Sequence, residues 1–480
     1  MNKIIKLVFV FVCSFFVINV NADVLTLDDC LNLVLKNNSE LKSIQLNIDA
    51  IKGKLAQIEM VYSYFLSAGV SCADDKSGRP FSLLGRPYEI KNLAYDAAVN
   101  KMFGFGTQVS FGLNGSHTDS VFMSDSVNLN VTDIAPFIKL QQSLLKDING
   151  GTTKASVAKA KASAKSALYL LEYQKQNVLL NAKIAYWNLS YAKTVIDFRK
   201  NALNRLEKIL DWNQKRFSMD LAEKSDLLQS QAAVKLGNLN LKNAYEQENK
   251  ANRTVNQFLA ITDVIVKYDV EKFEEKGEAF NSDYEPKKIC TRLDVLSSLE
   301  DVNSATYDQI SNKKTSGADL ILSGQLALNG VDEDFEFVKD NLTRAQRPSY
   351  SLGLRYSLPL NFKLRRILNQ GYEAAKISAQ KKAEYLSIKE NNDWQQLLDD
   401  WNDAKLKNIL AIEIEQIQKQ RKQEDEKLLK TGRTTTYLVL QTEQALDDAT
   451  LNVLGSILEL IRISETAKAF YSYNLELKVN

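Results

Sequence analysis

Two very long stretches of this chain contain no proline. The prolines stand at only six positions, which leaves 137–285 and 360–480 without one: Pro80, Pro87, Pro136, Pro286, Pro348 and Pro359. Glycine is also scarce there, and between 152 and 262 only Gly237 occurs. Because proline breaks helices and glycine weakens them, both stretches are predicted to be helical.

The apolar spacing and the length of these stretches limit the fold further. Leu203, Leu206 and Leu210 recur at intervals of three and four residues, the period of an amphipathic helix. A single helix over 364–430 would be about 100 Å long. A helix of that length is typical of a coiled coil or a helical barrel rather than of a globular core.

Other parts of the chain alternate with a period of two. In 104–116, Val109, Phe111 and Leu113 fall on one face and polar or small residues on the other. The ranges 318–329 and 349–358 alternate in the same way, so all three are predicted to be strands. One apolar and one polar face fit a half-buried soluble sheet or a membrane β-barrel. The range 330–348 is predicted to be a polar loop.

The order of these elements predicts an internal duplication. Short helices, strands and a long helical hairpin occur once in each half of the chain. The first repeat has strands over 66–145 and a hairpin over 151–260; the second has strands over 318–360 and a hairpin over 362–473. We expect the following divisions: a signal peptide over 1–22, the first repeat over 23–262, a linker over 263–288 and the second repeat over 289–480.

The amino terminus has the pattern of a secretory signal peptide. Lys3 and Lys6 precede an apolar run that ends near Val20, and Ala22 completes a plausible cleavage site. A membrane anchor is the alternative. No later run of about 18 apolar residues follows, so we expect no transmembrane helix in the mature chain. An exported soluble protein and a β-barrel membrane protein both remain compatible with this pattern.

Charge, histidine and cysteine content argue against several classes of function. The formal net charge is +2, which gives no electrostatic basis for nucleic-acid binding. His117 is the only histidine, so we expect no metal site, no cofactor and no enzyme activity. Cys30, Cys72 and Cys290 are an odd number of mature cysteines, which favours free thiols, although a bond between Cys30 and Cys290 stays possible.

The two long helical stretches are interrupted at matching points. Residues 427–445, KLLKTGRTTTYLVLQTEQA, align without a gap with residues 215–233, KRFSMDLAEKSDLLQSQAA. Gly432 is a natural helix end in the left-handed conformation, and Asp220 can take that role in the first copy. We expect Thr434 and Ser225 to cap the outgoing helices.

Several motifs resemble those of the TolC-like outer-membrane factor family, and the resemblance covers nearly the whole mature chain. They lie in the same order and at similar spacing: LTLDDCL at 25–31, KNNSEL at 36–41, KLQQSLL at 139–145, RLDV at 292–295 and PSYSLGL at 348–354. Serine or leucine replaces the family's proline at three positions, and aspartate replaces its glycine at the first break: Ser39, Ser143, Leu293 and Asp220.

The resemblance implies a mixed α and β membrane protein. Three copies would close one β-barrel in the outer membrane, with about four strands from each copy, continuous with a long periplasmic α-helical barrel. The range 66–103 is longer than the family requires and is predicted to hold an extra hairpin. The implied partners are the other two copies of a homotrimer, outer-membrane lipid, a periplasmic adaptor (membrane fusion) protein and an inner-membrane transporter.

The implied function is the exit duct of a tripartite efflux pump or a type I secretion system, gated at the periplasmic helix tips. The candidate gate residues are Asp226, Arg433, Thr434 and Gln441. The candidate turn and adaptor-contact residues are Phe217, Asp220, Leu221, Ala222, Gly432 and Thr435. Glu443 is compatible with a position in the lumen or away from it. The alternative is an exported periplasmic coiled-coil structural or adaptor protein without a pore.

Overall fold

The computed structural model describes residues 24–76, 87–122, 128–262, 266–271, 273, 285–344 and 347–470. The expected signal peptide over 1–22 lies outside the described residues. The chain divides into two compact units, which are described separately. The sheet unit comprises 43–174 and 290–394; the helical unit comprises 1–42, 175–289 and 395–480.

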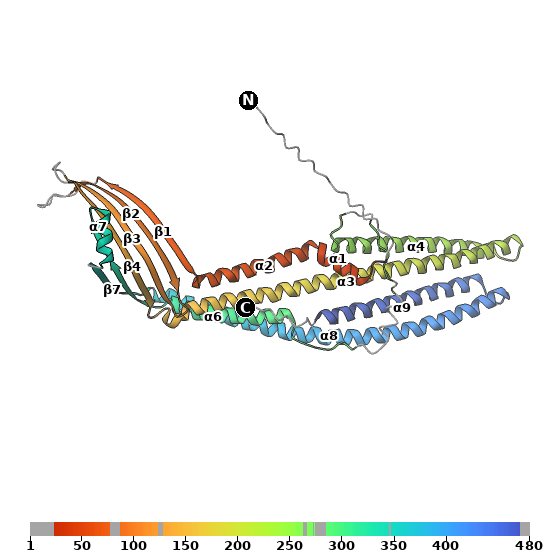
Figure 1. Cartoon of the computed structure of the whole chain (residues 1–480). Helices are drawn as coiled ribbons and strands as arrows, with labels where there is room; N and C mark the ends of the chain where they lie inside the picture. Colours follow the sequence, from red (N-terminus) through yellow and green to blue (C-terminus); the bar gives the residue numbers. More distant parts are fainter. Residues whose placement is uncertain are drawn as a thin grey trace, which may run out of the picture. The chain divides into compact units, whose positions relative to one another are not determined.

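The sheet unit is built around one antiparallel sheet of seven strands (Figure 1). The strands are β1 (Tyr64–Asp75), β2 (Pro87–Met102), β3 (Thr107–Phe122), β4 (Asn128–Ser143), β5 (Asp319–Leu328), β6 (Gly330–Asp332) and β7 (Pro348–Ser357). Six of them follow the order β1-β2-β3-β4-β5-β7, and the short β6 pairs with β4. The two halves of the chain therefore share one sheet through the β4–β5 pair.

The strand number differs from the expectation of about four. Six long strands lie side by side, because the extra hairpin predicted in 66–103 is present as β1 and β2 and extends the sheet at one edge. The predicted strands over 104–116, 318–329 and 349–358 correspond to β3, β5 and β7. The resemblance correctly implied a sheet but underestimated its width.

The register gives the sheet one apolar and one polar face. Residues directly opposite each other in neighbouring strands share a face. One such row crosses all six long strands and is apolar and exposed throughout: Leu66, Val99, Phe111, Ile138, Leu326 and Tyr350. The row beside it, on the other face, is mostly polar: Phe65, Asn100, Ser110, Lys139, Gln325 and Ser351.

The polar face is linked across strands by side-chain hydrogen bonds. Ser110 Oγ donates to Asn100 Oδ1 at 2.6 Å, and Asn100 Nδ2 donates to Ser67 Oγ at 3.2 Å. Ser143 Oγ donates to Asp319 Oδ1 at 2.6 Å between β4 and β5. This face can therefore satisfy polar groups and contact water, whereas the opposite face is apolar along its central rows and carries a few charged side chains nearer the strand ends, such as Lys101 and Asp119.

The prediction of a polar loop over 330–348 is wrong. Within it, β6 is followed by helix α7 (Phe335–Thr343), whose N-cap Asp334 accepts a hydrogen bond from the Glu336 amide at 3.1 Å. Val338 is fully buried, and a Cβ at Gly330 would come within 2.6 Å of the Val338 carbonyl oxygen. Gly330 lies opposite Ile134 of β4, so α7 packs on the apolar face of the sheet.

The helices of this unit connect to one end of the sheet, the end at which β1 begins. They are α2 (Ser39–Glu59) with the 3-10 turn η1 (Met60–Tyr62), the start of α3 (Gly151–Ser218), α6 (Leu293–Thr315) and the start of α8 (Phe362–Lys430). Between β4 and α3 lies the 3-10 turn η2 (Ile148–Gly150), and Asp147, just before it, accepts hydrogen bonds through Oδ1 from the Thr152 and Thr153 amides. This carboxylate caps α3 as it begins.

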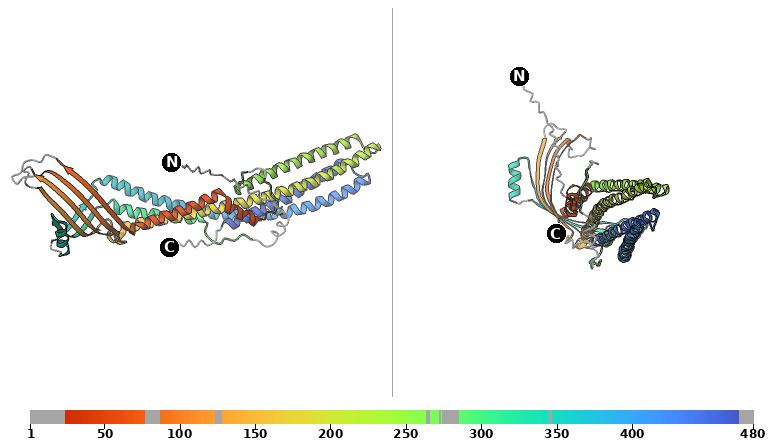
Figure 2. Two further views of the ribbon diagram at one scale, coloured as in Figure 1. Left: turned by 45° about the horizontal axis from the view of Figure 1, so that its top comes forward. Right: turned by 90° about the vertical axis from the view of Figure 1, so that its right-hand side faces the viewer.

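The helical unit contains α1 (Leu27–Asn37), α4 (Lys224–Phe258) and α9 (Thr436–Phe470), together with the later parts of α3 and α8 (Figures 1 and 2). α8 runs for 69 residues without a break, as its freedom from proline predicts. The unit's packing includes a small core in which Trp401 and Ala404 of α8 contact Leu460 and Ile463 of α9. None of the described helices is long and apolar enough to cross a membrane.

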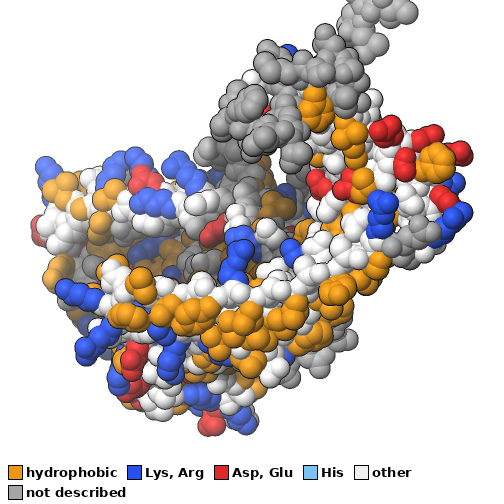
Figure 3. All heavy atoms as spheres, turned by 90° about the vertical axis from the view of Figure 1, so that its left-hand side faces the viewer, with side chains coloured by type: hydrophobic (Ala, Val, Ile, Leu, Met, Phe, Trp, Pro, Cys, Tyr) orange, Lys and Arg blue, Asp and Glu red, His pale blue; other side chains and the backbone are white. Residues whose placement is uncertain are grey.

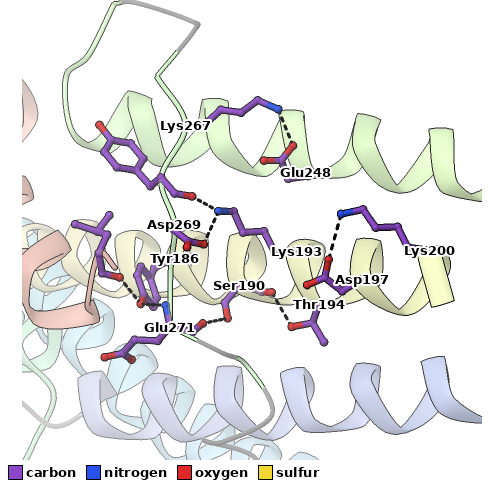
Figure 4. A network of polar contacts seen from close by, with 12 residues as sticks. Tyr186, Ser190, Lys193, Thr194, Asp197, Lys200, Glu248, Lys267, Asp269 and Glu271 are labelled. Atoms are coloured by element: carbon purple, nitrogen blue, oxygen red, sulfur yellow. Dashed lines mark hydrogen bonds and ion pairs between the residues drawn. The ribbon is translucent and has the colours of Figure 1, made fainter. Parts of the chain in front are cut away.

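The described residues of the expected linker over 263–288 are packed rather than loose. Val270 and Phe273 are buried, and Leu25 pairs with Val270 in a parallel β-bridge. Tyr186 Oη of α3 donates to the Leu25 carbonyl and accepts from the Glu271 amide (Figure 4). The segment is thereby held against α3, which a sequence pattern rich in charges did not indicate.

Within the described residues, no disulfide is present, and no group of three or more His, Cys, Asp or Glu is placed to hold a metal ion.

Candidate functional site

The turn between α3 and α4 closes the first hairpin. Asp220 has φ +56°, in the left-handed region. Its amide donates to the Phe217 carbonyl at 3.1 Å, and the Leu221 amide donates to the Arg216 carbonyl at 2.8 Å. These two bonds form a Schellman motif, in which the left-handed residue ends the helix and satisfies its last carbonyl groups.

The turn between α8 and α9 closes the second hairpin in the same way. Gly432 has φ +70°. Its amide donates to the Leu429 carbonyl at 3.1 Å, and the Arg433 amide donates to the Leu428 carbonyl at 2.9 Å. Each donor and acceptor lies 212 positions after its counterpart in the first hairpin. The sequence prediction that Asp220 and Gly432 share this conformation is confirmed.

The predicted caps of the outgoing helices are wrong. α4 begins at Lys224, so Ser225 lies inside its first turn, and Glu223 occupies the N-cap position without a side-chain hydrogen bond. α9 begins at Thr436, and the Leu438 amide donates to Thr435 Oγ1 at 3.4 Å. α4 thus begins earlier than a cap at Ser225 requires, and α9 begins one residue later than a cap at Thr434 requires.

The side chains at the two turns differ in exposure. Most of the candidate turn and contact residues are exposed to solvent, namely Phe217, Asp220, Leu221, Gly432 and Thr435, as are Arg433 and Gln441. Ala222, Asp226 and Thr434 are half-buried. In the described part of the chain, the Asp226 carboxylate and the Arg433 guanidinium make no ion pair with each other, so the predicted gate pair is not formed within one copy.

A buried polar contact joins the two hairpins close to their turns. Asn213 of α3, Ser230 of α4 and Thr436 of α9 are all fully buried. Asn213 Nδ2 donates to Ser230 Oγ, and Thr436 Oγ1 donates to Asn213 Oδ1 at 3.1 Å. Ser230 Oγ in turn donates to the carbonyl of the gate candidate Asp226 at 2.8 Å. Buried polar groups that are satisfied in this way fix one packing arrangement of the helices.

Further along the helices lies a charge cluster, formed by Arg199, Arg205, Lys422, Glu443 and Asp447. Arg205 of α3 contacts both carboxylates of α9, with Nε 3.0 Å from Glu443 Oε2 and Nη2 2.6 Å from Asp447 Oδ1. Lys422 Nζ of α8 lies 2.7 Å from Glu443 Oε1, and Arg199 Nη1 lies 3.6 Å from Asp447 Oδ2. Glu443 is 3 % exposed, which settles that it faces the helix packing.

The pKa values of two carboxyl groups of α9, the half-buried Asp447 and the buried Glu465, are shifted in opposite directions. Burial raises the pKa of Asp447 to about 6, against the opposing effect of Arg205 and with a further increase from Glu443. The pKa of Glu465 is lowered, because hydrogen bonds from Lys183 and Lys468 outweigh its burial. Protonation near neutral pH therefore acts on the charge cluster and not on the Glu465 contacts.

A groove of about 540 Å³ lies beside the charge cluster, between α3, α4 and α9. Leu206, Leu236 and Leu440 line its apolar part, and Gln441 and Asp447 line its polar part. A Cβ at Gly237 would come within 3.1 Å of Leu203 and Leu206, so the absence of a side chain there lets α4 approach α3. The groove places the gate candidate Gln441 beside the carboxylates of the charge cluster.

Comparison with known proteins finds matches in the fold and none in the sequence. No protein-family model matches the sequence, and no curated protein matches it. Solved structures do match. The CmeC outer membrane channel of Campylobacter jejuni is 16% identical, with a TM-score of 0.66 over 92% of this chain and 85% of that chain.

Two further structures match over a similar extent. The outer membrane protein VceC of Vibrio cholerae is 13% identical, with a TM-score of 0.64 over 92% of this chain and 94% of that chain. The open state of the MtrE outer membrane channel of Neisseria gonorrhoeae is 11% identical, with a TM-score of 0.64 over 92% of this chain and 88% of that chain.

The chain shares the fold of these outer-membrane channels. The resemblance read from the motifs is confirmed at the level of fold. Residues of two of the motifs make contacts that hold helices together. Asn38 Nδ2 donates to the Phe258 carbonyl at 2.9 Å, and Arg292 Nη1 lies 2.9 Å from Asp393 Oδ2. The buried Arg292 guanidinium and its carboxylate partners stabilise the start of α6 against α8.

The sequence did not predict the charge cluster that joins the two hairpins. Arg205, Lys422 and Asp447 are charged residues in helices full of charges, and nothing in their spacing marks them as buried partners. A usable signal existed for Glu443 alone, since the helical period places it on the same helix face as Thr436 and Leu440. The predicted turns, in contrast, depend on contiguous residues and were located correctly.

Proposed function

We propose that this protein is an outer-membrane channel of a tripartite export system, which conducts substrate passively from a periplasmic adaptor and transporter complex to the exterior. The observation that carries the proposal is the fold, shared over about 92% of the chain with outer-membrane channels. The exposed apolar face of the sheet supports it, since this face suits lipid contact (Figure 3).

In this proposal, three copies close one β-barrel and one helical barrel, and the two structural repeats of each copy contribute to both. A single sheet with free edges is not tolerated within lipid, so closure between copies is required. The long helices need lateral neighbours as well, because their own unit buries only part of their apolar side chains. Exposed Leu406, Ile409 and Ile417 of α8 are available for this packing.

The proposed gate consists of the two hairpin turns, with Asp226, Arg433, Thr434 and Gln441 at the closure. Asp226 and Arg433 are not paired within one copy, so their proposed contact is between neighbouring copies. Such exposed pairs contribute about 0–1 kcal/mol each, which suits a gate that a partner has to open. Phe217, Asp220, Leu221, Ala222, Gly432 and Thr435 are the proposed contact surface for the adaptor.

Cell fractionation and conductance test this function. The protein should be found in the outer-membrane fraction as a trimer that survives mild detergent and dissociates on heating. A monomer released by osmotic shock would contradict the proposal. Cross-linking in cells followed by co-purification should then capture an adaptor and a transporter, and the identity of that transporter distinguishes efflux from protein secretion.

Alanine variants test the gate separately from the channel. Asp226→Ala and Arg433→Ala should each raise single-channel conductance or antibiotic entry, because either removes the proposed contact between copies. Lys419→Ala removes an exposed charge elsewhere on α8 and serves as the control. Equal conductance in both variants, the control and the unmodified protein would remove this gate assignment and leave the channel function untouched.

A further inference from the structure

We infer that each copy contributes six strands to the membrane barrel, so that the closed trimer has eighteen strands and a wider outer lumen than the family resemblance implies. The inference rests on the proposed function, because it needs the trimer. Its structural basis is the β1–β2 hairpin, which continues the sheet in register rather than folding away from it.

The pairing of β1 and β2 is as complete as that of the other strands. All twelve residues of β1 have a partner in β2, from Tyr64 opposite Lys101 to Asp75 opposite Ile90. β2 is then paired along its length with β3. Since β3 has strands on both sides, it cannot serve as the edge that meets a neighbouring copy. The edges of the sheet are β1 and β7.

The apolar face continues to both of these edges. On β1, Leu66 and Val70 are 76% and 77% exposed, and on β7, Tyr350 and Leu352 are 87% and 81% exposed. These side chains belong to the same face as Phe111 and Ile138 in the middle of the sheet. An apolar surface suited to lipid thus spans all six long strands. If the β1–β2 hairpin lay in water outside the barrel, it would have no need for exposed apolar side chains on this face.

Strand direction also fits closure by a second copy. β1 follows α2 and η1 and runs away from the helical end of the sheet, whereas β7 runs back towards α8. Six antiparallel strands place opposite directions at the two edges, so β7 of one copy can pair antiparallel with β1 of the next. Tyr64 and Tyr356 then lie near the same rim, where aromatic side chains are common in membrane barrels.

Eighteen strands change the lumen. Barrel diameter grows roughly linearly with strand number, so eighteen strands give a diameter about 1.5 times that of twelve. Porins of sixteen to eighteen strands contain an aqueous channel. The lumenal face here is lined by small or polar side chains such as Ser67, Asn100 and Ser110, which leave that space to water. The strand region would therefore pass cargo larger than small solutes.

Disulfide cross-linking between copies tests which strand is the edge. Cys72 of β1 is exposed and lies on the apolar face, so it serves as one partner after Cys30→Ala and Cys290→Ala. The second partner is placed on β7 by Tyr350→Cys, Leu352→Cys or Leu354→Cys, one at a time, to cover the register. Oxidation of membranes should give covalent dimers and trimers with at least one of these.

The matched comparison adds Cys72→Ser and places the first cysteine on β3 by Phe111→Cys, with the same β7 positions. In an eighteen-stranded barrel these variants should not cross-link, because β1 and β2 lie between β3 and the β7 strand of the next copy. Cross-linking from β3 and not from β1 would overturn the inference while leaving the trimeric channel intact. A protein that is never trimeric would contradict the proposed function itself.

Electron microscopy of the purified trimer decides the matter if no cysteine pair reacts. Averaged maps of the barrel should show eighteen strands, and a count of twelve would overturn the inference. The heat-dissociation behaviour of each variant identifies any that fail to assemble.

Discussion

The two hairpin turns share their backbone geometry and differ in their charges. Both use the same pair of Schellman hydrogen bonds, at positions 212 residues apart. The first places Asp220 in the left-handed conformation, whereas the second places Gly432 there. The two turns thus have the same backbone geometry, and they differ in the charges of their side chains.

The same asymmetry continues into the helices. The first hairpin supplies Arg199 and Arg205 to the charge cluster, and the second supplies both carboxylates together with Lys422. The cluster therefore holds one hairpin against the other by opposite charges. Because the two arginines come from one hairpin and both carboxylates from the other, two hairpins of identical sequence could not form this arrangement.

The largest expected effect comes from removing the buried carboxylate of the cluster. Glu443→Ala leaves Arg205 and Lys422 without their shared partner in a largely buried site, and should lower the free energy of unfolding by about 3–5 kcal/mol. Thermal unfolding in detergent measures this. Gln444→Ala, at the exposed neighbouring position, should change stability by about 0.5 kcal/mol or less. Equal effects of the two variants would show that the cluster does not join the hairpins.

The pH dependence of stability should report on Asp447. Its pKa of about 6 in the folded protein lies above its ordinary value of 3.8, so the folded state binds the proton more tightly. The stabilisation that comes from this tighter proton binding is fully present below about pH 4. It is lost as the pH rises through 6, which lowers the free energy of unfolding by on the order of 2–3 kcal/mol. Asp447→Asn should remove this slope between pH 4 and 7, as measured by thermal unfolding.

Glu465 provides the matched control for that titration. Its pKa is lowered, so its contribution is present above its unfolded pKa and is lost as the pH falls through the folded one. Glu465→Gln should therefore reduce acid sensitivity at low pH and leave the slope near pH 6 unchanged. A slope near pH 6 that persists in Asp447→Asn would contradict the assignment to Asp447.

Substitution of the glycine in the second turn should have a smaller effect. A Cβ at Gly432 would meet no atom within 4 Å, so Gly432→Ala tests the left-handed backbone conformation alone. The cost should be about 1–2 kcal/mol in the free energy of unfolding. Equilibrium unfolding checks this, and the absence of any loss would show that the second turn changes conformation readily.

The reciprocal change in the first turn should have the smallest effect, of the opposite sign. Asp220→Gly relieves the left-handed strain of a residue with a side chain but adds freedom to the unfolded chain. A net gain of about 0.5 kcal/mol is expected in the same unfolding measurement. A loss of stability would mean that the Asp220 carboxylate has a stabilising contact in the assembled protein.

The sequence was sufficient for features that depend on neighbouring residues. The unbroken α8 follows from the absence of proline, and the two turns follow from Gly432 and from the repeat that aligns Asp220 with it. The strands follow from alternation, as in Val109, Phe111 and Leu113. Each of these is determined over a few consecutive residues, and so it can be read from a single chain.

Features that depend on distant partners were missed or misread. The helix α7 was mistaken for a loop because its polar residues outnumber Val338 and Leu342, although Asp334 was a usable N-cap signal. The family resemblance alone implied about four strands, and only the extra length of 66–103 indicated the added hairpin; its pairing with β3 could not be read from the sequence. The charge cluster joins Arg205 to Glu443 across 238 positions. No local pattern distinguishes such partners from the exposed charges around them.

The most direct test of the account is the conductance of the purified protein in planar lipid bilayers. We expect discrete single-channel steps from a detergent-extracted trimer, of low conductance while the hairpin turns are closed and higher in Arg433→Ala. A stable trimer that inserts and never conducts, in the unmodified protein or in the gate variant, would contradict the claim that this chain forms an outer-membrane channel.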